Sequence, residues 1–296
     1  MVQLVVDSGC DLPDEFLRKY AIPVLPHSVS MGNDAFADQR NPAQMAHFYT
    51  LSLIDRSRQV ATGPASEQDI EQILKRQLQL GQKDIVIQTI NAANSPTFAN
   101  AVNVARKLSN GDVQIHPIDS HTLFSGQGLL ALFTLSLIQR GMTGAQIKAR
   151  TEEFGRKITG YAAIRDVYYL RERGRQKNEK SVSWLKAFMA RSLNLHPIIK
   201  MTHEGSSVAD TVKEYDNCNR QLFDIAAEKI RAGELLMPAV VVSIAGPLKD
   251  LEKVPGFRAF EQLAQEHKVK VYRSVMSLSG GINLGPGTVA LAFAGK

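Results

Sequence analysis

A buried strand that runs directly into a capped helix is the feature that most limits how this chain can fold. Ile85-Val86-Ile87 is a short, apolar, β-branched run typical of a buried strand. Residues 97–108 then place apolar side chains at helical spacing, with Ser95 positioned to cap the helix and Pro96 at its first position. This order leaves free backbone N–H groups at the carboxyl end of the strand, where a polar or anionic ligand can bind. In most turns of this kind, however, the polar residues only cap the helix.

The same alternation of strand and helix recurs through the first half of the chain. Residues 2–6 and 113–118 are expected strands, and each is followed by polar residues, Asp7-Ser8 and Asp119-Ser120. Alternating strands and helices predict right-handed crossovers and a mainly parallel sheet. We therefore expect Asp7-Ser8, residues 91–95 and Asp119-Ser120 to lie at one edge of that sheet. Thr62 is expected nearby, in a polar loop over residues 60–67 that leads into a helix capped by Ser66.

Other expected elements of the first half are a helix capped by Asp11 and an extended strand over residues 21–29. After about Gly160 the pattern changes. A Tyr-rich strand is expected over residues 161–170, followed by a basic turn over residues 171–175, an amphipathic helix over 183–195 and a hairpin around 203–205. We predict an α/β fold with two domains. Residues 1–159 form an N-terminal domain with a mainly parallel sheet and flanking helices, and residues 160–296 form a C-terminal domain with a mixed sheet and helices.

The composition narrows the class of protein. The chain has 296 residues, 44% hydrophobic and 22% charged, with a net charge of +6. Its two cysteines, Cys10 and Cys218, are far apart, which excludes a disulfide framework and a structural zinc site. The N-terminus reads as a strand rather than a signal peptide, and the longest apolar patch is too short to span a bilayer. We expect a cytoplasmic protein with no cofactor and no metal.

A basic region over residues 165–191 is compatible with an anionic partner, since cations strongly outnumber acids there. It has no interleaved aromatic residues and no helix-turn-helix, OB or zinc pattern, so we expect no nucleic-acid partner. A solvated basic face is the simpler interpretation for most of these charges.

Seven segments occur in a consistent order along almost the whole chain. They are VVDSGCDLP (5–13), ATGPAS (61–66), NAANSPTFANA (91–101), IDSHTLFSGQGLL (118–130), YYLRERGRQ (168–176), LNLHPIIK (193–200) and LGPGTVAL (284–291). Together they resemble the DegV family of fatty-acid-binding proteins. The resemblance implies two α/β domains that hold one long-chain fatty acid, with its carboxylate at the domain junction and its acyl tail in the second domain.

The resemblance also implies candidate site residues. Thr62 matches the family's carboxylate-binding threonine, and Arg175 matches the arginine of its GGR-type segment, where a surface ion pair is an equally good explanation. The full set of expected ligand-binding residues is Ser8, Thr62, Asn91, Ala92, Ser95, Ser125, Arg175 and Asn283. No catalytic residue is expected.

The chain departs from the family pattern in the segments that surround the head group. The family usually has two serines where this chain has Asn91 and Ala92, and Ala92 cannot donate through its side chain. Asn283 stands where the family often has a histidine, which removes a group that changes charge near neutral pH. Arg173 stands where the segment usually has its first glycine. These changes predict that the chain has the family's fold but an altered pocket for the head group.

We expect non-catalytic binding of a long-chain fatty acid or related lipid. The resemblance implies that the carboxylate is presented to a separate kinase subunit, and it is compatible with transient membrane contact. The chain itself has no phosphate loop.

The alternative is a small-molecule hydrolase or phosphatase that uses Asp, Ser and Thr groups at the sheet edge. Against it, residues 5–9 lack the second aspartate of an aspartyl-phosphate phosphatase, and residues 124–128 are not a Gly-x-Ser-x-Gly elbow. His121 directly follows Ser120, so a Ser–His pair cannot be presumed there.

Overall fold

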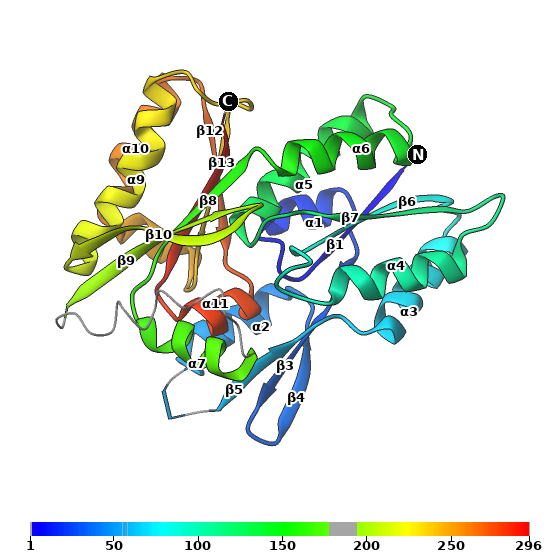
Figure 1. The fold of residues 1–296 in the computed structure, drawn as a ribbon, viewed down its shortest axis with the longest axis horizontal. Coiled ribbons are helices and arrows are strands. Elements are labelled where there is room, and N and C mark those ends of the chain that lie inside the picture. The colour runs from blue at the N-terminus through cyan, green and yellow to red at the C-terminus, as the bar shows by residue number, and fades with distance from the viewer. Residues whose placement is uncertain (1, 55, 58, 178–193, 296) are drawn as a thin grey trace.

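The two halves of the chain form two sheets that lie side by side (Figure 1). The computed structural model describes all residues except 1, 55, 58, 178–193 and 296. In Figure 1 the N-terminal half is on the right, in blue to green, and the C-terminal half is on the left, in green to red. The predicted two-domain α/β fold is confirmed.

The N-terminal half is built on a parallel sheet with strand order β2-β1-β6-β7. Its strands are β1 (Gln3–Asp7), β2 (Val24–Leu25), β6 (Asp84–Thr89) and β7 (Gln114–Asp119). All three pairings are parallel, as predicted. The flanking helices are α1 (Asp14–Lys19), α3 (Glu67–Gln79), α4 (Thr97–Leu108), α5 (Ser125–Gln139) and α6 (Gly144–Gly155). Both faces of the sheet are covered, which explains why the strands are continuous apolar runs.

Two predicted helix caps are wrong, and a third is confirmed. Ser66 caps α3 by accepting a hydrogen bond from Asp69 N at 3.1 Å. The N-cap of α4 is Pro96 rather than Ser95, although Ser95 Oγ still accepts from Thr97 N at 3.3 Å. Asp11 does not cap α1, because that helix begins three residues later, after Pro13. Asp11 is instead fully buried, where it serves a different purpose.

A small antiparallel sheet, with order β4-β3-β5, was not predicted. It comprises β3 (His27–Met31), β4 (Asp34–Asp38) and β5 (Val60–Gly63), and α2 (Pro42–Thr50) follows β4. The single strand expected over residues 21–29 is thus divided at Pro26, which has no N–H for strand pairing. The expected polar loop over residues 60–67 begins as a strand, in which Thr62 pairs with Val29.

The C-terminal half carries the predicted mixed sheet, with order β10-β9-β8-β13-β11-β12. Its strands are β8 (Ile158–Ala163), β9 (Leu195–Thr202), β10 (Gly205–Lys213), β11 (Ala239–Ile244), β12 (Lys270–Val275) and β13 (Val289–Ala294). Its helices are α7 (Val167–Lys177), α9 (Tyr215–Arg231), η2 (Leu248–Lys253), α10 (Phe257–Glu266) and α11 (Leu278–Leu284). Among the described strands of this sheet, β11 and β12 pair in parallel and the other pairings are antiparallel.

The strand expected over residues 161–170 is wrong in its second half. β8 ends at Ala163, and the basic residues 171–175 lie in helix α7 rather than in a turn. Most of the helix expected over residues 183–195 lies outside the described residues, and Leu195 begins strand β9.

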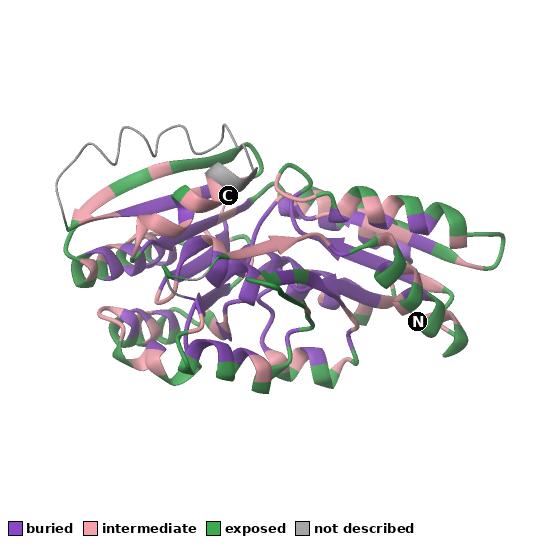
Figure 2. Cartoon of the chain, turned by 90° about the horizontal axis from the view of Figure 1, so that it is seen from below, coloured by how far each residue is buried: buried purple, intermediate pink, exposed green. Residues whose placement is uncertain are grey.

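Helix α5 joins the two halves. It contacts β1 on one side and β8, β11 and β13 on the other. Its residues from Ser125 to Leu132 are all buried, and Figure 2 shows buried segments running through the middle of the molecule. A Cβ on Gly128 would lie 2.7 Å from the carbonyl oxygen of Asp11, so only glycine permits this close approach.

A buried ion pair forms a second connection between the halves. Arg40 Nη1 lies 3.2 Å from Asp11 Oδ1, and both side chains are almost completely buried. Arg40 Nη2 donates to the carbonyl of Val275 at 3.0 Å, and the backbone N–H of Ser277 donates to Asp11 Oδ1 at 2.8 Å. Burial raises the pKa of Asp11, and the charge of Arg40 opposes that shift. The N-terminal half therefore supplies both charges, and the C-terminal half completes their hydrogen bonds.

Among the described residues, no helix combines the length and the hydropathy needed to cross a lipid bilayer.

Replacing Arg40 with Met is expected to lower the free energy of unfolding by about 3–5 kcal/mol, because it leaves the Asp11 carboxylate buried without its cation. The loss should grow as pH rises, since the variant can neutralise Asp11 only by protonation. Urea unfolding of the wild type and the variant at mildly acidic and mildly alkaline pH measures both effects.

The matched control is Arg18→Met, which breaks the exposed pair between Arg18 and Asp14. It should cost less than about 1 kcal/mol. An equal loss in both variants would show that the junction does not depend on the buried pair.

Candidate functional site

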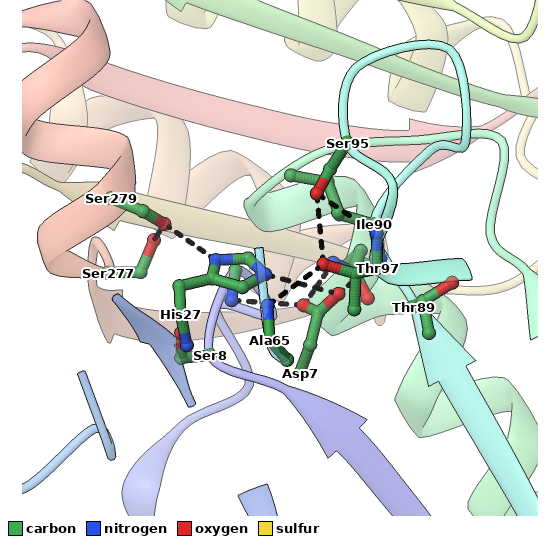
Figure 3. A network of polar contacts seen from close by, with 12 residues as sticks. Asp7, Ser8, His27, Ala65, Thr89, Ile90, Ser95, Thr97, Ser277 and Ser279 are labelled. Carbon is green, nitrogen blue, oxygen red and sulfur yellow. Dashed lines mark hydrogen bonds and ion pairs between the residues drawn. The ribbon is translucent and has the colours of Figure 1, made fainter. Parts of the chain in front are cut away.

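The carboxyl ends of the strands from both sheets meet at the junction of the two halves. Asp7 ends β1, and its Oδ2 accepts from the backbone N–H of Ile90, just after β6, at 2.5 Å. Asp119 ends β7, and its Oδ1 accepts from Ala92 N at 3.1 Å. The predicted gathering of these polar turns at one sheet edge is confirmed. Ser277 and Ser279, just beyond the carboxyl end of β12, face this edge from the C-terminal half (Figure 3).

A cavity of about 280 Å³ lies at this junction. Its wall is contributed by the small sheet, the β6–α4 turn, the loop before α5, and helices α7 and α11. The lining residues are His27, Thr62, Gly63, Pro64, Ile90, Asn94, Ser95, Pro96, Leu123, Phe124, Arg173, Ser279 and Asn283.

The apolar side of the cavity is continuous with a hydrophobic core shared by both halves. Ile90, Leu123 and Phe124 line the cavity and belong to this cluster. The same cluster contains buried residues of the C-terminal half, among them Leu170, Ile199, Met201 and Ile282. Polar groups at the cavity therefore border directly on an apolar region.

Thr62 and Asn283, two of the predicted site residues, contact each other across the junction. Asn283 Nδ2 donates to Thr62 Oγ1 at 3.1 Å and to the carbonyl of Ser279 at 2.6 Å. Both amide hydrogens of Asn283 are therefore engaged, and Thr62 keeps its hydroxyl hydrogen for a ligand. Asn283 positions Thr62 rather than offering a donor of its own.

Ser95 also lines the cavity, where it is held by Thr97. Ser95 Oγ lies 2.9 Å from Thr97 Oγ1, which accepts from Ala65 N at 3.3 Å (Figure 3). When Thr97 donates to Ser95, the hydroxyl hydrogen of Ser95 is directed elsewhere and can meet a ligand.

Two groups that change the charge of the cavity were not predicted as site residues. Arg173 lines the cavity because α7 is a helix, so the position that departs from the family pattern places a cation at the site. His27, at the start of β3, also lines the cavity, and its Nε2 lies 3.5 Å from Asp7 Oδ2 while its Nδ1 lies 3.4 Å from Ser279 Oγ. Although Asn283 replaces the histidine that the family often has, the cavity still contains an imidazole, that of His27.

The sequence contains one feature that could have predicted His27 as a site residue. Strand β2 ends at Leu25, so Pro26-His27 directly follows the carboxyl end of a parallel strand, at the same edge as Asp7. The strand expected over residues 21–29 placed His27 inside a strand instead of after its end. Arg173 had no such signal, because its direction depends on the helix that replaces the expected turn.

Four of the expected ligand-binding residues do not line this cavity. Ser8 is fully buried, and its Oγ accepts from His27 N at 3.0 Å, so it fixes the start of β3. Ser125 is fully buried at the start of α5. Asn91 turns its Oδ1 to Ala93 N at 2.9 Å, and exposed Ala92 commits its N–H to Asp119. Arg175 lies in α7, but its side chain is outside the described residues.

The described part of the chain contains no group of three or more His, Cys, Asp or Glu side chains suited to holding a metal ion.

Comparison with solved structures shows that this fold is shared. A stearic acid-binding protein from Eubacterium ventriosum superposes with a TM-score of 0.80 at 18% identity, covering 100% of this chain and 99% of that one. DegV from Bacillus subtilis, described as a fatty acid binding protein, superposes with a TM-score of 0.78 at 18% identity and the same coverage.

Sequence comparison extends over the full length. A DegV domain-containing protein from Xanthomonas axonopodis pv. citri is 32% identical over 307 aligned positions, covering 100% of this chain and 98% of that protein. The family model described as "Uncharacterised protein, DegV family" matches residues 1–296. The chain therefore belongs to the DegV family.

Proposed function

We propose that this protein binds a long-chain fatty acid or a related lipid without catalysing a reaction on it. The observation that carries the proposal is the junction cavity, where hydroxyl donors and a cation border on a continuous apolar core. Relatives with the same fold are described as binding fatty acids, which supports the same ligand class here.

The head group is recognised by the polar side of the cavity in this proposal. A buried carboxylate is costly unless donors meet it. The hydroxyls of Thr62 and Ser95 supply neutral donors, and Arg173 supplies a charge-assisted one. This set replaces the donors that Ala92 and Asn283 do not provide.

The acyl tail supplies most of the affinity. Each methylene transferred from water to an apolar site contributes about 0.8 kcal/mol. We place the tail along the shared core beside Ile90, Leu123 and Phe124, toward the C-terminal half, which we treat as a domain over residues 160–296 that follows a domain over residues 1–159.

We further propose that the protein acts in the cytoplasm and presents the head group to a separate kinase subunit, with transient membrane contact during loading. Exposed Pro96 and half-buried Asn94, Ser95 and Arg173 line the cavity, so its polar end adjoins the surface. A partner that acts on the head group needs such access.

One arrangement favours the alternative, a hydrolase. Ser279, His27 and Asp7 follow one another in the order of a serine hydrolase triad. The nearby backbone donors are already engaged, however, because Gly280 N donates to Ser277 Oγ and Gly281 N to the carbonyl of Ser277. Neither is available to stabilise an oxyanion. Hydrolysis of a p-nitrophenyl acyl ester that disappears in Ser279→Ala would favour this alternative.

Replacing Thr62 with Val is expected to weaken fatty-acid binding about tenfold, because it removes a donor to a charged group and keeps the shape of the side chain. Titration of delipidated protein with a fluorescent fatty acid measures the dissociation constant, and circular dichroism checks the fold. Thr211→Val on β10, a half-buried strand threonine outside the cavity, is the matched control. Equal affinity in the Thr62 variant and the wild type would contradict the proposed contact.

Replacing Arg173 with Met should also weaken carboxylate binding about tenfold, since it removes the cation and keeps a good helix former. Binding of the alcohol of the same chain length should change far less. Arg171→Met is the control on the same helix, because exposed Arg171 stacks on Tyr168 and does not line the cavity. A similar loss for acid and alcohol would assign Arg173 a structural role instead.

A further inference from the structure

His27 stands at the boundary between the buried charges of the junction and the ligand cavity. The residue is only 4% exposed, yet it lines the cavity. One ring nitrogen faces Asp7 and the other faces Ser279, so the imidazole connects the N-terminal half to α11 (Figure 3).

The charged groups around His27 come from three directions. Asp7 lies behind the ring, with its carboxylate held by Gly9 N, Ile90 N and Gln127 Nε2. Asp38, on β4, is also buried, and burial raises its pKa while the charges of Arg40 and His27 oppose the shift. Arg173 lines the cavity from α7.

These neighbours act on the imidazole in opposite senses. The carboxylates of Asp7 and Asp38 favour the protonated ring, whereas Arg173 disfavours it. An anion in the cavity would add a further negative charge next to both His27 and Arg173. The ligand therefore changes the balance that sets the protonation of His27.

Protonation also changes what His27 offers to the cavity. When the neutral ring carries its hydrogen on Nε2, toward Asp7, Nδ1 accepts from Ser279 Oγ. The protonated ring carries a hydrogen on both nitrogens, so Nδ1 donates to Ser279 Oγ, and the hydroxyl hydrogen of Ser279, which lines the cavity, is released from Nδ1. Only the protonated form places a positive charge at the cavity wall while it keeps its contact with Asp7.

We propose that His27 is a specificity-determining residue of this cavity, which takes up a proton when an anionic head group binds and thereby makes lipid affinity depend on pH. This inference rests on the proposed function. Binding an acid is linked to protonation of His27, and linkage is reciprocal: the bound acid raises the pKa of His27, and protonated His27 binds the acid more tightly. Affinity for an acid is then highest below the pKa of the free protein and falls until the pH exceeds that of the complex.

The test uses two ligands of equal length, dodecanoate and dodecanol, with delipidated full-length protein. The acid stays ionised between about pH 6 and about pH 8, whereas the alcohol is neutral throughout. For the wild type, the dissociation constant of dodecanoate should rise about tenfold over this range, and that of dodecanol should stay constant. In His27→Gln, which cannot titrate, dodecanoate should bind weakly at both pH values.

His121→Asn is the matched control. His121 also faces a carboxylate, Asp119, at 3.4 Å at the same sheet edge, but it does not line the cavity. Asn tolerates the positive φ of 54° at this position. This variant should keep the pH dependence of the wild type.

A second measurement keeps the inference testable if His27→Gln folds poorly. The imidazole resonances of the wild-type protein are titrated by NMR with and without dodecanoate, and His27 is assigned by the loss of its signal in His27→Gln or His27→Asn. An increase in its pKa on binding is expected.

The outcomes separate the inference from the function that it rests on. If dodecanoate binds the wild type with no pH dependence, or if His27→Gln keeps the full pH dependence, His27 is not the linked group and the fatty-acid proposal stands. If the wild type binds neither ligand at any pH, the proposed function fails and the inference falls with it.

Discussion

The buried pair of Asp11 and Arg40 is the interaction on which the junction depends. Both charges come from the N-terminal half, but their remaining hydrogen bonds are completed by Ser274, Val275 and Ser277 of the C-terminal half. If the C-terminal partners were lost while the pair stayed buried, Asp11 and Arg40 would lack part of their hydrogen bonds, which is costly for charges kept out of water. Ser277, which donates to Asp11, caps helix α11, and α11 contributes Ser279 and Asn283 to the cavity. The cavity is lined by residues of both halves, so its geometry requires that the halves stay packed.

The two sheets direct the carboxyl ends of their strands toward the same region. In a parallel sheet these ends carry the turns in which polar side chains and free N–H groups gather. Here most of that polarity is used internally: Asp7, Ser8 and Asp119 bond to neighbouring backbone N–H groups. Apart from those of the β6–α4 turn, the polar side chains that line the cavity come from the small sheet and from helices α7 and α11, among them Thr62, His27 and Arg173. The carboxyl-end edge of the parallel sheet therefore supports the site, and the small sheet, α7 and α11 supply most of its polar groups.

The side chains that line the cavity suit a ligand with an anionic head group and an apolar chain. Asn283 uses both amide hydrogens to hold Thr62 and α11, so it prepares a hydroxyl donor rather than acting as one. The charge comes from Arg173 and, in its protonated form, from His27. In the proposed function, the permanent charge of Arg173 supports binding at all pH values, and the imidazole of His27 adds to it when it is charged.

The sequence by itself determined the parallel sheet and the mixed sheet, because hydrophobic periodicity and turn residues are local properties of the chain. Its ordered motifs predicted Thr62, Ser95 and Asn283 as site residues. The sequence also indicated the shared sheet edge. Only the tertiary structure decided that Ser8, Asn91 and the backbone N–H of Ala92 are used within the scaffold, since a polar group is committed by whichever neighbour the fold places beside it. The same holds for His27 and Arg173, whose roles depend on a strand divided at Pro26 and on a helix where a turn was expected. Contacts between residues that are distant in the chain have no local signature, and the cavity consists almost entirely of such contacts.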